Sequence, residues 1–213
     1  MAYEYRRMTP EQRTAAVRAR REAGYPHHSP PHPYRGSGCF CITAANYEHE
    51  SVMSPPARLT SFEDRLLSEL TDVGVEVSAW VILTNHYHFL VLVHSLDQIS
   101  ATLQHLHGST SREWNLEDGL TNQRKVWYRF RDRCIRSEAQ YYHALNYIHY
   151  NPVKHGYVDS PYDWPWSSVH RYADTLGRAW LRQQWLAQPA RKGWHYGDDE
   201  VAVEGIETST GPP

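Results

Sequence analysis

Positions 86–93 read HYHFLVLV, and this segment is the strongest indicator of the fold. Its run of bulky and β-branched residues is short, which predicts a β-strand in which side chains two positions apart project from the same face. His86 and His88 would then lie side by side, about 6–7 Å apart along the strand. Two imidazoles at that spacing suit two ligands of one divalent metal ion. Two buried histidines that hydrogen-bond to backbone carbonyls are an equally acceptable interpretation of the pair alone.

The segments on either side of this strand predict an α+β domain. Strands are expected at 38–45, 75–83, 86–93 and 125–135, and helices at 61–73, at 96–114 and from Ser137 onward. Ser61 and Ser137 are expected to cap the helices that they begin. The order βαββαβ with one added C-terminal helix is typical of a ferredoxin-like antiparallel sheet.

The composition indicates one domain with appended arms, because a chain of 213 residues is long enough for a single hydrophobic core. We expect a basic, Pro/His-rich N-terminal arm at 1–35, the principal domain at 36–175, and a C-terminal helix with an acidic tail at 176–213. No segment is apolar enough to cross a bilayer and no secretory signal is visible. We therefore predict a cytoplasmic protein without a membrane partner.

The charged residues are unevenly distributed. The formal net charge of −2 argues against a general polyanion binder, but basic residues predominate in 1–35 and in 122–155. Local basic patches bind phosphate backbones whatever the total charge, although such runs are usually only solvated faces. The residues that could contact DNA are Arg18, Arg20, Arg21, Arg129, Arg131, Arg133, Arg136 and Lys154.

The helix that begins after Ser137 can be divided into faces by taking about 100° per residue. The residues expected to bury against the sheet are Tyr141, Ala144, Leu145 and Ile148. The residues expected together on one flank of that face are His143, Tyr147, Asn151 and Lys154. Asn146 and Tyr150 are expected to point away from the core. Pro152 disfavours helical geometry at the preceding residue, so the helix is expected to kink or end near Asn151.

The flank of this helix carries groups that suit phosphoryl transfer. A tyrosine such as Tyr147 can act as a covalent nucleophile. The amide oxygen of Asn151 is a hard ligand for Mg²⁺ or Mn²⁺, and the Lys154 ammonium could balance phosphate charge. Aromatic residues at helical spacing are more often simple core residues, so the helix phase alone leaves both interpretations open.

Several ordered motifs together resemble those of the REP-associated tyrosine transposases, which lie within the HUH single-tyrosine transposase superfamily. The motifs are AWVILTNHYH at 79–88, WYRFRDR at 127–133, IRSE at 135–138, NYIHYNPVKHGY at 146–157 and DWPWSS at 163–168. The resemblance as a whole covers roughly residues 30–172. Several motifs in the right order are much more specific than any one of them.

The resemblance implies a metal-dependent, site-specific nickase and strand transferase that acts on single-stranded DNA beside REP-like hairpins, in contact with the nucleoid. His86, His88 and Asn151 would hold Mg²⁺ or Mn²⁺. Tyr147, on the added helix, would attack the scissile phosphate and leave a 5′-phosphotyrosine and a free 3′-hydroxyl. Such a protein would act as a monomer or a homodimer and would carry out DNA transposition or recombination.

Two other functions are compatible with the sequence. One is a domesticated hairpin-binding protein that binds DNA without cutting it. The other is a hydrolase that uses His86 and His88 on a small phosphodiester, while Tyr147 only packs. A covalent protein–DNA product would distinguish the transposase from both.

Overall fold

The computed structural model describes residues 37–121 and 124–189, together with residues 9, 11, 12, 15 and 18. The described residues from 37 to 189 lie in one compact unit, and the five near the N-terminus lie in another. In the smaller unit, Thr9 and Gln12 are joined by reciprocal hydrogen bonds between backbone N–H groups and side chains. The sheet and helices of the larger unit contain the predicted site.

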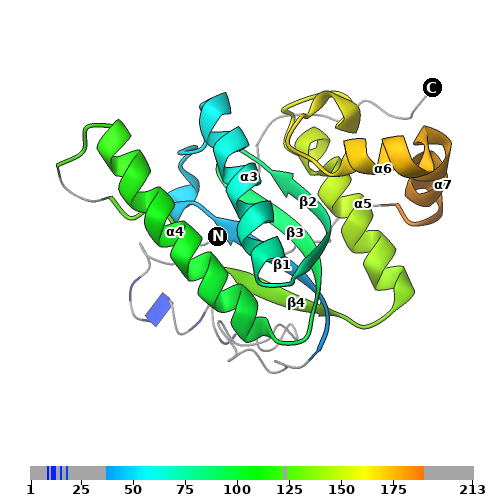
Figure 1. The fold of residues 1–213 in the computed structure, drawn as a ribbon, viewed down its shortest axis with the longest axis horizontal. Coiled ribbons are helices and arrows are strands. Elements are labelled where there is room, and N and C mark those ends of the chain that lie inside the picture. Colours follow the sequence, from blue (N-terminus) through cyan, green and yellow to red (C-terminus); the bar gives the residue numbers. More distant parts are fainter. Residues whose placement is uncertain are drawn as a thin grey trace. The chain divides into compact units, whose positions relative to one another are not determined.

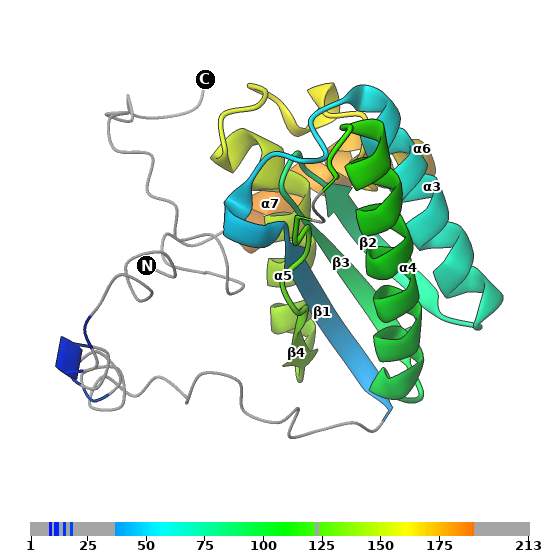
Figure 2. The same cartoon turned by 90° about the vertical axis from the view of Figure 1, so that its left-hand side faces the viewer.

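The larger unit is built around a four-stranded antiparallel sheet with the strand order β2-β3-β1-β4 (Figure 1; Figure 2). Its elements in chain order are β1 (Gly38–Ala45), η1 (Tyr47–His49), α3 (Pro56–Asp72), β2 (Glu76–Ile82), β3 (His86–Val93), α4 (Leu96–Glu117), β4 (Arg131–Ile135), α5 (Glu138–Lys154), η2 (Pro161–Asp163), α6 (Val169–Leu176) and α7 (Arg178–Ala187). This order and topology confirm the predicted ferredoxin-like α+β fold. None of the helices in the described residues has both the length and the apolar character needed to span a bilayer.

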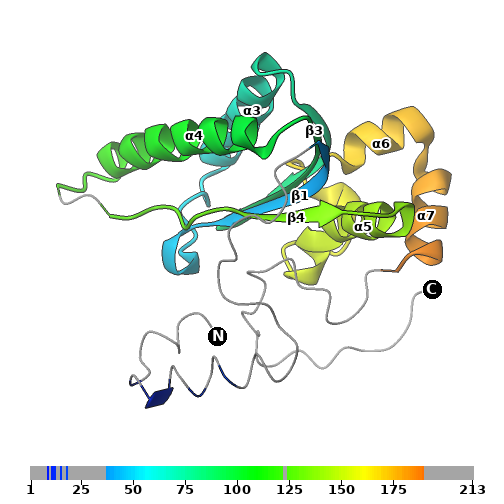
Figure 3. The ribbon, with the colours of Figure 1, turned by 90° about the horizontal axis from the view of Figure 1, so that it is seen from below.

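The two faces of the sheet are covered by different helices (Figure 3). α3 and α4 lie on one face, whereas α5 crosses the other. Tyr87 of β3 contacts Phe62 of α3 and His107 of α4, with ring centroids 5.1 and 5.9 Å away. Since neighbouring strand residues point to opposite faces, His86 and His88 are turned toward α5.

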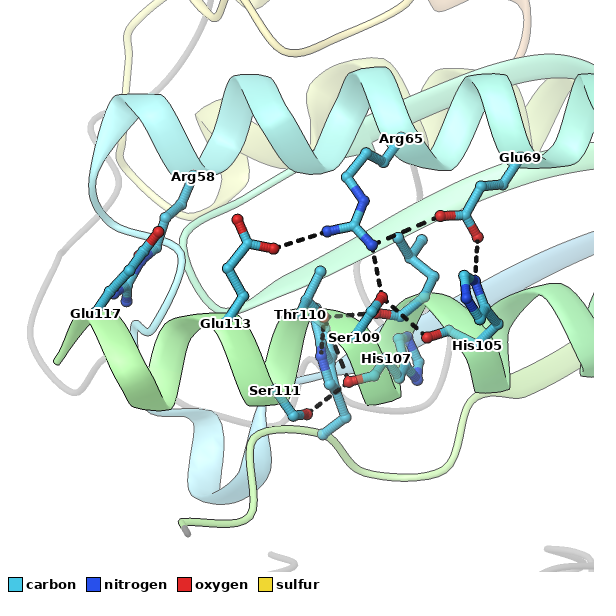
Figure 4. Close-up of polar contacts among 12 residues, drawn as sticks. Arg58, Arg65, Glu69, His105, His107, Ser109, Thr110, Ser111, Glu113 and Glu117 are labelled. Carbon is cyan, nitrogen blue, oxygen red and sulfur yellow. Dashed lines mark hydrogen bonds and ion pairs between the residues drawn. The ribbon is translucent and has the colours of Figure 1, made fainter. Parts of the chain in front are cut away.

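Polar contacts join α3 to α4 along their length (Figure 4). Arg65 pairs with Glu113 at 2.9 Å, and Glu69 lies 3.1 Å from His105 Nδ1. Each of these pairs is at least partly exposed, and exposed ion pairs contribute little to stability. The buried apolar contacts between these helices and the sheet therefore stabilise this layer.

The DWPWSS segment covers the outer edge of β2. The backbone N–H of Ile82 donates to the Trp166 carbonyl at 2.9 Å, and that of Ser168 donates to the Trp80 carbonyl at 3.0 Å. The Ser168 hydroxyl accepts from the Trp80 N–H at 3.0 Å and lies 3.0 Å from His149 Nε2 of α5. This segment therefore protects an edge strand and connects α5 to the sheet.

Three predicted boundaries are wrong. α3 begins at Pro56 rather than at Ser61, because a proline in the first turn has its φ already set for a helix. α4 continues to Glu117, one turn beyond the predicted end. β4 covers only Arg131–Ile135, since residues 124–130 contribute a single isolated bridge to the sheet. By contrast, the prediction that Ser137 caps α5 is confirmed, because its side chain accepts from a backbone N–H at 3.2 Å.

The face of α5 that was expected to point away from the core is covered by another helix, α7. Asn146 is buried, and its Nδ2 donates to the carbonyls of Gln184 and Gln188 at the end of α7, at 3.1 and 2.7 Å. Tyr150 is half-buried against Trp185 of the same helix, with ring centroids 4.8 Å apart. A helix that packs against neighbours on two sides cannot be recognised from its own periodicity.

α5 does not end near Asn151 as predicted. It continues through Pro152 to Lys154. Gly156, two residues after the last residue of the helix, adopts the left-handed conformation at φ +69° and donates its N–H to the Val153 carbonyl at 3.0 Å. Asn151 therefore lies within the helix, in its last turn and one turn after Tyr147.

Candidate active site

The α5 face of the sheet brings four predicted site residues together. β3 presents His86 and His88, whose ring centroids are 5.1 Å apart. α5 presents Tyr147, whose ring lies 5.2 Å from that of His88, and Asn151, whose Oδ1 lies 3.2 Å from His86 Nε2. All four residues are buried. They meet because α5 packs across β3 opposite the two histidines.

The Nδ1 atom of each imidazole contacts a polar side chain. His86 Nδ1 lies 2.7 Å from Asn85 Oδ1, and His88 Nδ1 lies 2.7 Å from Thr43 Oγ1. Thr43 is the residue of β1 directly opposite His88 in the antiparallel register. With both Nδ1 atoms in these contacts, Nε2 is the atom of each ring that a metal ion would bind.

Both imidazoles are neutral at pH 7. Burial first, and then neighbouring groups such as His155 and Lys154, lower the pKa of His86 and of His88 well below the ordinary value. A neutral imidazole carries a lone pair, which metal coordination requires. The pair is therefore in the protonation state that binds a cation.

Lys154 lies close to the phenol of Tyr147. Its Nζ is 3.5 Å from the Tyr147 hydroxyl oxygen and 4.9 Å from the centre of the ring. Burial lowers the pKa of Lys154 to about 8, so the amine is still mostly protonated at neutral pH. A positive charge at this position attracts the negative charge that forms on an attacking phenol oxygen.

The donor set depends on the amide of Asn151. Within residues 37–121 and 124–189, no three His, Cys, Asp or Glu side chains are grouped to hold a metal ion. His155 is near, with its ring 4.9 Å from that of His86, but it does not complete a histidine triad. A metal site here would therefore use two imidazoles and the Asn151 oxygen.

The predicted DNA-contacting residues occupy several places. Arg131 and Arg133 are exposed on β4, and both lie on the α5 face. Arg131 is the cross-strand partner of Thr43, and Thr43 is in turn the cross-strand partner of His88. The backbones of Arg131 and His88 are therefore two strand spacings, or about 10 Å, apart. The other described members are Lys154, beside Tyr147, and the exposed residues Arg18, Arg129 and Arg136. Arg20 and Arg21 lie outside the described residues.

The sequence reasoning missed the polar groups that hold the two histidines. Thr43 is a polar residue in an otherwise apolar strand, and Asn85 directly precedes His86, so both carried a signal that could have identified them. His49, whose carbonyl accepts from Asn85 Nδ2 at 3.0 Å, carried none. It reaches the site from the turn after β1, and only the packing of that turn brings it there.

The geometry agrees with the resemblance found in the sequence. A histidine pair on an inner strand of a ferredoxin-like sheet, faced by a tyrosine on a crossing helix, is the arrangement implied by the resemblance to the HUH single-tyrosine transposases.

Comparisons with known proteins identify relatives within that class. The chain is 36% identical over 102 residues to the REP-associated tyrosine transposase of Escherichia coli (strain K12), an alignment that covers 47% of this chain and 58% of that protein. It is 35% identical over 105 residues to a provisionally named REP-associated tyrosine transposase of Haemophilus influenzae, covering 45% and 60%. No family model matches the chain.

A solved structure of a REP-associated tyrosine transposase bound to a REP hairpin has a similar fold. The TM-score is 0.56 at 25% identity, over 70% of this chain and 87% of that one. The predicted relationship to the REP-associated tyrosine transposases is thus confirmed. The chain spans about 60% of the length of the curated relatives that it matches.

Proposed function

We propose that this chain is a metal-dependent, site-specific DNA nickase and strand transferase that acts on single-stranded DNA beside REP-like hairpins. The observation that carries the proposal is the meeting of Tyr147 with His86, His88 and Asn151 on one face of the sheet. The names of the relatives support it, as does the hairpin bound to the solved relative. The proposed setting is the cytoplasm, in contact with the nucleoid.

The residues present fit a divalent cation such as Mg²⁺ or Mn²⁺. His86 Nδ1 faces the Asn85 oxygen, so the lone pair of the neutral ring is on Nε2, which faces Asn151 Oδ1 at 3.2 Å. Two acceptors in contact repel one another unless a cation is shared between them. The other amide atom, Asn151 Nδ2, is buried without a hydrogen-bond partner among the described residues. Asn151 Oδ1 and His86 Nε2 are therefore close enough to be ligands of one cation.

The chemistry follows from the residues around that position. A bound cation would polarise the scissile phosphate as a Lewis acid. The Tyr147 oxygen attacks phosphorus, its proton passes to solvent, and Lys154 stabilises the negative charge on the phenol oxygen. The bond to the 3′-oxygen breaks, and that oxygen takes up a proton. A second 3′-hydroxyl can reverse the step and join strands, because the phosphodiester energy is retained in the 5′-phosphotyrosine.

Substrate binding is assigned to the basic residues. Arg131 and Arg133 share the face of His88, where they would contact the phosphates that flank the cleaved bond. The remaining candidates are Arg18, Arg20, Arg21, Arg129, Arg136 and Lys154. Phosphate contacts of this kind position the strand, whereas stacking on aromatic side chains suits unpaired bases.

The experiment is a covalent-adduct assay with a labelled oligonucleotide that carries a hairpin and a single-stranded flank. Wild-type protein with Mg²⁺ or Mn²⁺ should give a labelled band of increased mass in denaturing gels, and a chelator should abolish it. Tyr147→Phe should remove the band while hairpin binding persists. Tyr150→Phe is the matched control, since Tyr150 packs against Trp185 of α7, and it should keep the band.

Two other results would contradict the proposal. A mobility shift without a covalent product under either metal would indicate a non-cleaving hairpin-binding protein. Adduct formation that is undiminished in Tyr147→Phe would remove this phenol from the mechanism.

A further inference from the structure

We infer that Asn85 is a positioning residue that holds His86 in the Nδ1–H tautomer, so that its Nε2 lone pair faces Asn151. This inference rests on the proposed function for its significance, but its geometry stands on its own contacts. Asn85 belongs to the tight turn between β2 and β3, directly before the first histidine.

The orientation of the Asn85 amide is set by the backbone. Its Nδ2 donates to the carbonyl of His49 at 3.0 Å, so the amide oxygen is the atom turned toward His86. An amide oxygen only accepts hydrogen bonds. At 2.7 Å from that oxygen, His86 Nδ1 must therefore be the donor. A neutral ring protonated at Nδ1 has its lone pair at Nε2.

The His49 carbonyl is itself held in an unusual position. Glu48 and His49 have φ values of +57° and +52°, the left-handed conformation that non-glycine residues rarely adopt. The backbone N–H of Asn46 donates to the Asn85 carbonyl at 2.7 Å, so this turn and Asn85 are joined by two hydrogen bonds. Two adjacent residues in a costly conformation persist only where the surroundings hold them there. Here they bring one carbonyl to the amide that orients the histidine.

His88 is anchored differently, which isolates the role of Asn85. Its Nδ1 contacts the Thr43 hydroxyl at 2.7 Å, and a hydroxyl can donate or accept. Thr43 therefore holds the orientation of the His88 ring without dictating its tautomer. Of the two anchors, only the amide of Asn85 has its direction set by a further hydrogen bond.

The test reads the tautomer directly in metal-free protein, by ¹⁵N NMR of the histidine rings. Wild-type His86 should be protonated at Nδ1. Asn85→Ala should give a mixture of tautomers or the Nε2–H form, whereas Asn85→Asp keeps an acceptor oxygen and should retain Nδ1–H. Asn115→Ala is the matched control, because buried Asn115 also donates to a loop carbonyl, that of Arg124 at 3.1 Å, but in α4.

The second readout is Mn²⁺ affinity. Loss of a residue that orients a metal-binding histidine typically weakens binding by about 10–100-fold, so Asn85→Ala should fall in that range while Asn115→Ala does not change. An Nε2–H tautomer in wild type, or an unaltered Nδ1–H tautomer in Asn85→Ala, would overturn the inference. Wild-type Nδ1–H that Asn85→Ala disturbs, in a protein that binds no Mn²⁺ and forms no adduct, would support the positioning role and overturn the proposed function.

Discussion

The histidines on the two faces of the sheet have different partners. On the α3/α4 face, His107 stacks on Trp127 with ring centroids 4.3 Å apart, and its Nε2 lies 2.8 Å from the Tyr87 hydroxyl. On the α5 face, His86 lies beside His88 and has its Nε2 3.2 Å from the Asn151 oxygen. Consecutive residues of one strand therefore supply an aromatic core on one side and a polar centre on the other.

This comparison shows which property indicates a site. Burial lowers the pKa of His107 to about 3, and it also places the pKa of His86 well below its ordinary value. A depressed pKa is therefore common to both faces and does not distinguish them. The two faces differ in the atoms that surround the histidines. Several atoms that can bind a metal ion lie close together on the α5 face, whereas the partners of His107 are an aromatic ring and a phenol.

The largest expected effect separates the two faces by activity. His88→Ala should reduce adduct formation to background, because one of the two imidazoles that bind the cation is lost. His107→Leu should leave adduct formation by the folded protein close to wild type. The measurement is the covalent-adduct assay at saturating Mn²⁺. Equal loss in both variants would show that the α5 face has no special role.

The second prediction separates the faces by stability. Phe62 is fully buried among the rings of Tyr87, Trp114 and Trp127. Phe62→Ala should therefore destabilise the fold by about 3–5 kcal/mol in urea unfolding. Tyr147→Phe removes only a hydroxyl and should change stability by less than about 1 kcal/mol. Similar values for the two variants would contradict the placement of Phe62 in a tightly packed aromatic cluster.

The third prediction concerns pH and applies to both faces. His107 and His149 each have a folded pKa of about 3, lowered by burial, whereas the unfolded chain binds these protons below about pH 6.5. The free energy of unfolding is therefore unaffected by these two histidines above pH 6.5. It decreases as the pH falls from 6.5 toward 3, by up to about 1.4 kcal/mol per pH unit for each histidine. Urea unfolding at pH 7.5, 6 and 5 measures this loss. His107→Leu should show a shallower pH dependence, and a flat wild-type profile would contradict the prediction.

The smallest expected effect concerns DNA affinity. Arg131→Ala should weaken hairpin binding modestly and lower the slope of log affinity against log salt by about 1, as expected for one lost phosphate contact. Arg65→Ala, in α3 on the opposite side of the sheet, should leave the slope unchanged. Fluorescence anisotropy over a salt series measures both. An equal change in the two variants would mean that DNA does not prefer the α5 face.

Local periodicity was enough to predict much of the site. The bounds of the His86–Val93 strand follow from one short run of bulky apolar residues, and the shared face of its two histidines follows from the two-residue period of a strand. The four-residue spacing of Tyr147 and Asn151 places both on one flank of a helix. The assignment of catalytic and metal-binding roles to these residues remains a prediction.

Two of the errors concern contacts between segments that are distant in the chain. Asn146 is polar and lies off the predicted core face, yet it is buried because α7 packs on a second side of α5. Residues 124–130 have the composition of a strand but find only one bridging partner in the sheet.

The sequence by itself determined the ferredoxin-like order of elements and the side chains that β3 and α5 would present, since strand and helix periods are properties of a continuous chain. Only the tertiary structure decided that the Thr43 hydroxyl contacts His88 Nδ1 and that the His49 carbonyl orients Asn85. Those contacts depend on strand register and on the packing of a turn, and no local pattern of residues encodes either.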